Sequence, residues 1–165
     1  MEVKPYQIHD KLMVSRCEET IRRLPDGGSF LDVGIGDGFL TNRIVESGKF
    51  DSVVAVEKYI ERPVYWLDFV LSDAENLPFD DDSFDYVGCF EMLEHTDNPQ
   101  MICDELARVC RSCVYVTVPI KRMQLDPGHK HFWDSDDLKA MMPGLSVIRL
   151  PVGEPRRWYW CEWQQ

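Results

Sequence analysis

Three glycines at alternate positions make residues 34–38 the segment of this chain with the clearest chemistry. The segment reads Gly-Ile-Gly-Asp-Gly, and it lies between an apolar run typical of a buried strand and a run with helical spacing. Glycine is needed where the backbone takes a positive φ or passes close to a ligand. The N-terminus of a helix offers unpaired N–H groups to a polar ligand. The segment therefore predicts a turn that holds a nucleotide.

The spacing of the glycines disfavours the turn of the dinucleotide-binding proteins. That turn reads Gly-x-Gly-x-x-Gly, and counted from Gly34 its third glycine would fall on Phe39. The third glycine is Gly38 instead. An acidic residue, Asp32, followed by a Gly-x-Gly-x-Gly turn resembles the first motif of the class I S-adenosylmethionine (SAM)-dependent methyltransferases. An NAD-linked oxidoreductase is the alternative that Phe39 disfavours.

A carboxylate stands at the end of the next apolar run. Residues 52–57 are typical of a buried strand, and Glu57 closes them, nineteen residues after Gly38. A carboxylate in this place can accept hydrogen bonds from both hydroxyls of a ribose. The alternative is an ordinary glutamate at a strand end, and the glycine turn before it favours the ribose clamp.

The resemblance extends to residues 72–79, Ser-Asp-Ala-Glu-Asn-Leu-Pro-Phe. They are similar to the methyltransferase segment after the third strand, in which an acidic side chain binds the adenine amino group, and Asp73 has that position. Asp32 would hold the ammonium group of SAM, directly or through water, because opposite charges attract strongly in a partly desolvated cleft. The cofactor-binding residues that the resemblance implies are Asp32, Gly34, Gly36, Gly38, Glu57, Asp73, Ala74 and Phe90.

Residues 90–95, Phe-Glu-Met-Leu-Glu-His, follow a further strand, at the edge where open α/β sheets bind ligands. They resemble the same segment of ubiquinone-pathway O-methyltransferases and, more loosely, of small-RNA 2′-O-methyltransferases. In those families Glu-x-x-Glu-His and a later histidine can hold a divalent cation that binds the acceptor hydroxyls. The resemblance makes Glu91, Glu94, His95 and His129 ligands of Mg²⁺, Mn²⁺ or Zn²⁺.

A site without a metal is the alternative for the same residues. Glu-His after the fourth strand is common among class I methyltransferases that use no metal, and there the histidine packs near the methyl group or caps a helix. His95 or His129 is then the candidate catalytic base. Imidazole titrates near neutral pH, so it can take the proton of an acceptor.

Apolar periodicity predicts the elements that must position these side chains. Strands and helices alternate, which favours a parallel sheet covered on both faces. With the resemblance, we expect an α/β fold: a Rossmann-like, doubly wound, mostly parallel seven-stranded sheet with an antiparallel C-terminal strand. One departure from the family is a short or irregular second crossover, because Pro63 interrupts the fifteen residues between Glu57 and Asp73. The expected helices are 10–24, 38–47, 98–110 and 135–142, and the expected strands are 29–34, 52–57, 69–72, 84–90, 113–118, 145–151 and 156–163.

Length, charge and cysteine usage limit the classes of function. A chain of 165 residues predicts one methyltransferase domain over 1–165 without a separate substrate domain, so specificity must come from loops. The net charge of −11 disfavours nucleic acid as a partner, and no apolar run is long enough to span a bilayer. The N-terminal residues lack the order of a secretory signal, which predicts a cytoplasmic protein with reduced thiols. Only one Cys-x-x-Cys pair occurs, Cys110 and Cys113, too few for a zinc site of four cysteines.

The predicted function is transfer of a methyl group from SAM to a small-molecule acceptor, with oxygen as the expected nucleophile. The oligomeric state stays open. Two alternatives remain. One is an RNA 2′-O-methyltransferase with a divalent metal site, and the other is a SAM-binding partner protein without catalytic activity.

Overall fold

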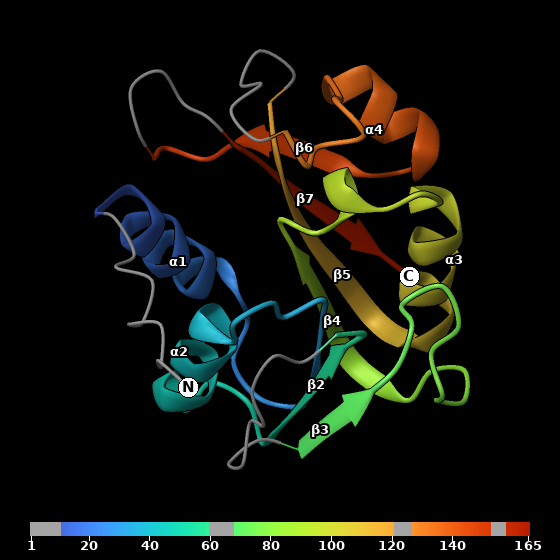
Figure 1. The fold of residues 1–165 in the computed structure, drawn as a ribbon. Helices are drawn as coiled ribbons and strands as arrows, with labels where there is room; N and C mark the ends of the chain where they lie inside the picture. Colours follow the sequence, from blue (N-terminus) through green and yellow to red (C-terminus); the bar gives the residue numbers. More distant parts are fainter. Residues whose placement is uncertain (1–10, 60–67, 121–126, 153–157) are drawn as a thin grey trace, which may run out of the picture.

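The computed structural model of the chain describes residues 11–59, 68–120, 127–152 and 158–165. Its strands form one sheet in the order β3-β2-β1-β4-β5-β7-β6 (Figure 1). Neighbours among the first five strands pair in parallel, while β7 pairs antiparallel with both β5 and β6. The predicted fold class is confirmed. The bounds are β1 (Ser29–Val33), β2 (Ser52–Glu57), β3 (Asp68–Leu71), β4 (Phe84–Phe90), β5 (Cys110–Pro119), β6 (Ser146–Arg149) and β7 (Trp158–Gln164).

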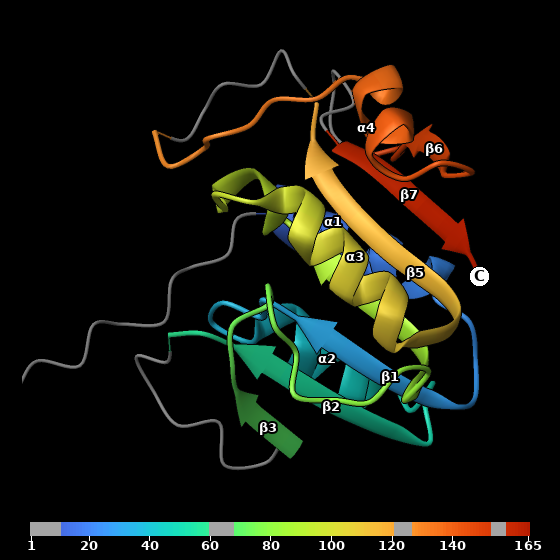
Figure 2. The same cartoon turned by 90° about the vertical axis from the view of Figure 1, so that its right-hand side faces the viewer.

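Helices cover both faces of the sheet. The described helices are α1 (Lys11–Arg23), α2 (Phe39–Ser47), α3 (Pro99–Val109) and α4 (Ser135–Met141), with a short 3₁₀ turn, η1 (Leu93–His95). Figures 1 and 2 show α1 and α2 on one face and α3 and α4 on the other. None of the described helices has the length and apolar character that crossing a membrane requires.

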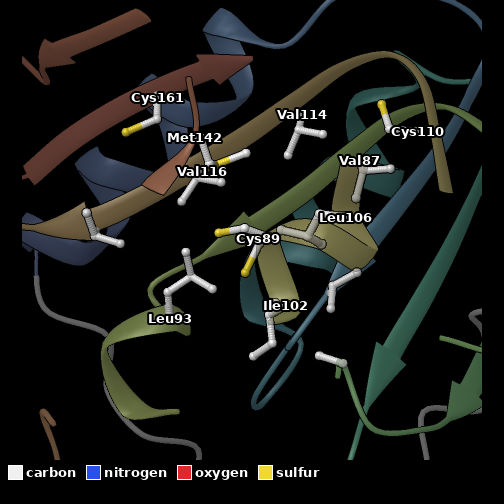
Figure 3. Packing of buried hydrophobic residues seen from close by; sticks show 14 of the residues in the cluster. Val87, Cys89, Leu93, Ile102, Leu106, Cys110, Val114, Val116, Met142 and Cys161 are labelled. Atoms are coloured by element: carbon white, nitrogen blue, oxygen red, sulfur yellow. The ribbon is translucent and has the colours of Figure 1, made fainter. Parts of the chain in front are cut away.

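Each face of the sheet has its own hydrophobic core. Successive side chains of a strand point to opposite faces, so β4 directs Val87 to the side of α3 and Phe90 to the side of α1 and α2. On the α3 side, Ile102 and Leu106 pack against the central strands (Figure 3). All six cysteines are free and buried. The two cores fix the central strands, and with them the turns at their carboxyl ends.

Local signals explain where the helices begin and end. Gly38, with a φ of 76°, precedes α2, and Gly48, with a φ of 64°, follows it and donates its N–H to the carbonyl of Val45. Pro99 starts α3, a position where proline loses no helical hydrogen bond. The Asp134 carboxylate caps α4 by accepting two backbone N–H groups.

The bounds of β5 and β6 differ from the predicted ones, and one short turn was not predicted. β5 begins at Cys110 rather than 113, because the exposed Arg111 and Ser112 hide the start of the strand from an apolar pattern. β6 covers only Ser146–Arg149, against the predicted 145–151. The turn η1 has no apolar period and was not predicted. The crossover around Pro63 and the turn residues 153–157 lie outside the described residues.

Candidate functional site

A pocket of about 440 Å³ lies at the carboxyl ends of β1 to β4. This is the size of a small-molecule site, and the carboxyl edge is where open α/β sheets bind their ligands. Each of the four strands contributes the turn that follows it. The lining includes Gly34, Gly36, Glu57, Lys58, Tyr59, Asp73, Ala74, Glu75, Glu91, Met92, His95, Asp97 and Lys130.

Two glycines of the first turn serve different purposes. Gly34 has a φ of 77°, and a Cβ there would lie 2.4 Å from Cγ of Met92. Gly36 has a φ of 57°, and a Cβ there would meet no atom within 4 Å. Gly34 therefore allows the Met92 side chain to pack against the turn, while Gly36 leaves open space on the pocket side.

The Glu57 carboxylate is oriented by backbone N–H groups at the pocket wall. Its Oε2 accepts the N–H of Gly36 at 2.8 Å, and its Oε1 accepts the N–H of Lys58 at 2.8 Å. Oε1 also accepts the N–H of Tyr59 at 3.3 Å. Each carboxylate oxygen has two lone pairs, so Oε2 retains a site for a ligand hydroxyl, and at Oε1 a hydroxyl would replace the long bond from Tyr59. The carboxylate at the end of β2 thus has a fixed orientation in the pocket lining, and its role as a diol clamp stays a prediction.

Asp73 after β3 is held in its ionised form. Its Oδ1 accepts the N–H of Glu75 at 3.1 Å, and its Oδ2 pairs with Nζ of Lys58 at 2.5 Å. The hydrogen bond from Lys58 lowers the pKa of Asp73 and raises the pKa of Lys58. Lys58 was missed in the sequence, since no motif marks it. A ligand that binds Asp73 must share it with Lys58 or displace the Lys58 ammonium.

Three of the predicted cofactor residues lie behind the pocket lining. Asp32 is 2% exposed, and its Oδ2 accepts the hydroxyl of Thr41 at 2.8 Å. Gly38 precedes α2, and Phe90 packs on Trp160 with ring centroids 6.3 Å apart. Asp32 is therefore buried beneath the glycine turn and bonded to α2. Two contacts with the SAM ammonium were predicted, a direct one and one through water, and this buried position suits the contact through water better. Their roles in binding stay predictions.

Burial gives Asp32 an unusual titration. Desolvation raises its pKa from 3.8 to about 7, the Thr41 hydroxyl opposes this, and the Glu57 charge adds to it. The unfolded chain therefore loses this proton first, so the carboxyl lowers stability progressively as the pH rises from about 4 to about 7. Above that range its effect is constant.

We expect Asp32→Asn to remove this dependence, because Asn cannot ionise but keeps an oxygen for Thr41. Thermal unfolding of both proteins across the pH range measures it. The melting temperature of the variant minus that of the wild type should grow as the pH rises from about 4 to about 7. A difference that stays flat would show that Asp32 titrates normally.

Two histidine rings meet beside the pocket after β4, where His95 belongs to the lining and His129 lies against it from outside. The carbonyl of Glu94 in η1 accepts the N–H groups of Lys130 at 2.7 Å and His131 at 3.2 Å, which brings residues 127–131 against η1. The rings of His95 and His129 lie edge to face with centroids 4.8 Å apart. Ligand atoms of Glu94, His95 and His129 all lie within 4.8 Å of one another. The structure therefore gathers three of the four predicted metal ligands.

Glu91 is turned away from that cluster. Its φ is 55°, and its side chain points to α1 and β7, where Trp158 donates its indole N–H to Oε2. Nη1 of Arg16 lies 4.0 Å from the other oxygen, Oε1. Burial raises the pKa of Glu91, and Arg16 opposes the rise. The predicted four-ligand set is thus not brought together as one site.

The fold and this pocket define a class I SAM-dependent methyltransferase domain. Residues 31–117, just over half of the chain, match the family described as "Methyltransferase domain". The chain belongs to this family, which implies SAM as the cofactor.

Individual relatives agree with the family. A ubiquinone biosynthesis O-methyltransferase of Coxiella burnetii is 26% identical over 139 residues, which are 79% of this chain and 56% of the relative. The chain therefore spans just over half the length of the curated relatives it matches. A SAM-dependent methyltransferase of Aquifex aeolicus aligns over 96% of this chain and 95% of its own with a TM-score of 0.74 and 18% identity. A chain from a Haloferax volcanii complex that contains the Trm112 methyltransferase activator aligns over 93% of this chain and 88% of its own, with a TM-score of 0.73 and 15% identity. At such identities the structural matches establish the fold alone.

Proposed function

We propose that this chain transfers the methyl group of SAM to a small-molecule acceptor through an oxygen nucleophile. The observation that carries the proposal is one pocket with two kinds of wall. The wall from β1 to β3 offers the glycine turn, Glu57 for the ribose hydroxyls and Asp73 for the adenine amino group. The wall after β4 offers Glu91 and His95 to an acceptor.

The chemistry asks the protein mainly for positioning. The sulfonium of SAM is already an activated leaving group, so catalysis consists of holding acceptor oxygen, methyl carbon and sulfur in line. An alcohol or phenol also has to lose a proton. Nδ1 of His95 lies 3.2 Å from the carbonyl of Gly128. The tautomer that donates this hydrogen bond leaves Nε2 free to accept that proton.

The charges around the pocket favour a small acceptor over a nucleic acid. Nucleic-acid binding needs clustered free cations. Of the lining residues, Lys58 pairs with Asp73, and Lys130 pairs with Asp97 at 2.6 Å. Carboxylates occupy much of the rest of the lining, and the whole chain has a net charge of −11.

Calorimetry and an acceptor screen test the proposal together. We expect S-adenosylhomocysteine, the product of methyl transfer, to bind and NAD not to bind. With SAM supplied, small phenols and alcohols should release S-adenosylhomocysteine faster than matched amines. Binding without turnover of any acceptor would favour a SAM-binding partner protein. RNA binding that weakens steeply with salt would favour the RNA methyltransferase alternative.

A divalent cation beside the pocket after β4 is a second candidate, supported by the cluster of Glu94, His95 and His129. The Glu94 side chain is almost fully buried, and Nδ1 of His129 is buried with no hydrogen-bond partner in the described part of the chain. Two imidazoles and one carboxylate suit Zn²⁺ or Mn²⁺ better than Mg²⁺, which prefers oxygen ligands. A bound cation would supply Lewis acidity for the acceptor hydroxyl.

We expect Zn²⁺ to bind the purified protein in a calorimetric titration. His129→Ala should weaken that binding by at least about tenfold, because even the loss of a residue that only orients a metal ligand costs about tenfold to a hundredfold. Lys139→Ala, an exposed change on α4, is the control. Methyl transfer that tolerates both a chelator and His129→Ala would leave the histidines without a metal role.

A further inference from the structure

A polar gap lies between α1, the end of β4 and the start of β7. Arg16 of α1 reaches it with a side chain that is 8% exposed, and Glu91 enters it from the pocket lining. Thr117 of β5 lies beside them, because its carbonyl accepts the N–H of Glu91 at 2.9 Å. Glu91 belongs to the pocket lining, whereas Arg16 and Thr117 lie behind it, so the gap adjoins the pocket beside the end of β4.

Two contacts hold the groups around this gap in place. The indole N–H of Trp158 fixes Oε2 of Glu91, and the Arg16 guanidinium lies over the Trp158 ring, 5.7 Å from its centroid. A cation over an indole face is attracted to the ring. Trp158 therefore positions both the carboxylate and the guanidinium.

The facing atoms of the two charged groups do not bond to each other. Oε1 of Glu91 and Nη1 of Arg16 are 4.0 Å apart, which is beyond hydrogen-bond range. Both atoms are buried, and neither has a hydrogen-bond partner within the described ranges. The Thr117 hydroxyl is also buried and outside hydrogen-bond geometry, although it lies close enough to the Glu91 carboxylate to lower the pKa of Glu91. Buried polar atoms without partners are unfavourable, so the arrangement is completed by a group placed between them.

One hydroxyl oxygen satisfies both atoms. It can donate its proton to Oε1 of Glu91 and accept a hydrogen bond from Nη1 of Arg16. Two such contacts of about 2.8 Å bridge the 4.0 Å separation with roughly a right angle at the oxygen. An ammonium group cannot accept from Arg16 and is repelled by it, and a carboxylate is repelled by Glu91. The gap therefore selects a neutral hydroxyl.

We propose that Arg16 and Glu91 form a hydroxyl-binding subsite for the methyl acceptor. The proposal rests on the proposed function and names the chemical group that the acceptor must present. Glu91 binds and orients the acceptor through this hydroxyl, a role different from the base role proposed for His95. The subsite also accounts for the orientation of Glu91 away from Glu94 and His95.

Fluorine NMR with three matched probes tests the subsite on protein saturated with S-adenosylhomocysteine. The probes are 4-fluorobenzyl alcohol, 4-fluorotoluene, which lacks the hydroxyl, and 4-fluorobenzylamine, which replaces it with a cation. We expect the alcohol to bind at least about tenfold more tightly than either of the others, because unpaired polar atoms reject analogues without the hydroxyl. The alcohol should also shift the indole N–H resonance of Trp158. Equal affinities for the three probes, or no binding of the alcohol, would overturn the subsite.

Variants assign the preference to the two residues. Glu91→Leu and Arg16→Met should abolish the preference for the alcohol, while Glu91→Gln, which keeps an acceptor oxygen, should retain part of it. Arg22→Met, an exposed change on the same helix, is the control. The milder Glu91→Gln keeps the test decisive if either of the other two variants does not fold. A preference that survives in every folded Glu91 and Arg16 variant contradicts the proposal.

S-adenosylhomocysteine affinity separates the two levels of inference. Wild-type protein that fails to bind it refutes the proposed function itself. The Glu91 and Arg16 variants should keep the wild-type affinity for S-adenosylhomocysteine within about twofold. If the wild-type protein binds S-adenosylhomocysteine but does not favour the alcohol, only the subsite is refuted.

Discussion

Glu57→Ala is expected to weaken S-adenosylhomocysteine binding by about 1.5–3 kcal/mol, or roughly tenfold to a hundredfold in affinity. The variant loses a carboxylate that three backbone N–H groups hold at the pocket wall, two of them at 2.8 Å and the third at 3.3 Å. Hydrogen bonds to a charged group are stronger than neutral ones, and the ribose hydroxyls would lose two of them. Calorimetric titration at constant pH measures the change.

Glu57 also stabilises the glycine turn, because its carboxylate accepts the N–H of Gly36. Control variants must therefore separate the loss of a ligand contact from a general effect of removing a carboxylate. Glu46→Ala removes an exposed carboxylate from α2 without touching the pocket lining, and its affinity should equal that of the wild type. Glu57→Gln keeps one oxygen and loses the charge, so it should fall between the two. A folded Glu57→Ala protein with wild-type affinity would exclude the ribose clamp.

The sequence could predict that the glycine turn, Glu57 and Asp73 share one pocket wall, because the signals for these segments are local. The glycine turn, Glu57 and Asp73 each follow an apolar run, and a parallel sheet places the ends of such runs at one edge. The doubly wound sheet confirms that geometry, with Gly34, Glu57 and Asp73 in the lining of one pocket. Asp32 and Phe90 were also predicted to bind the cofactor, but they lie behind the pocket lining. The alternation of side chains along a strand turns both of them to the face of the sheet that α2 covers.

The arrangement of Glu91 and Glu94 after β4 could not be predicted from the sequence, because it depends on contacts between distant segments. Glu91 and Glu94 are three residues apart, a spacing that places two side chains together on a helix. The chain is not helical at Glu91, where φ is 55°, and η1 begins only at Leu93. The neighbours that orient Glu91 come from α1 and from Trp158, sixty-seven residues away. No local pattern encodes Arg16 as their partner.

Alanine at Gly34 and at Gly36 should separate the folding role of the turn from its binding role. Gly34→Ala adds the left-handed backbone strain of a non-glycine residue, about 1–2 kcal/mol, to a Cβ only 2.4 Å from Met92. Overpacking of this kind lowers the free energy of unfolding by a further 1–3 kcal/mol, roughly. We expect its free energy of unfolding to fall by about 2–5 kcal/mol in denaturant titrations.

Gly36→Ala should lose only the backbone part, about 1–2 kcal/mol, because its Cβ meets no atom within 4 Å. That Cβ enters the open side of the turn, so S-adenosylhomocysteine binding should be lost while the fold persists. Met92→Ala combined with Gly34→Ala removes the clash and should recover the packing part, which a double-mutant cycle measures as coupling. Equal destabilisation of the two single variants, with no coupling to Met92, would mean that the turn is uniformly strained. The division between Gly34 as a packing residue and Gly36 as a ligand-facing residue would then be wrong.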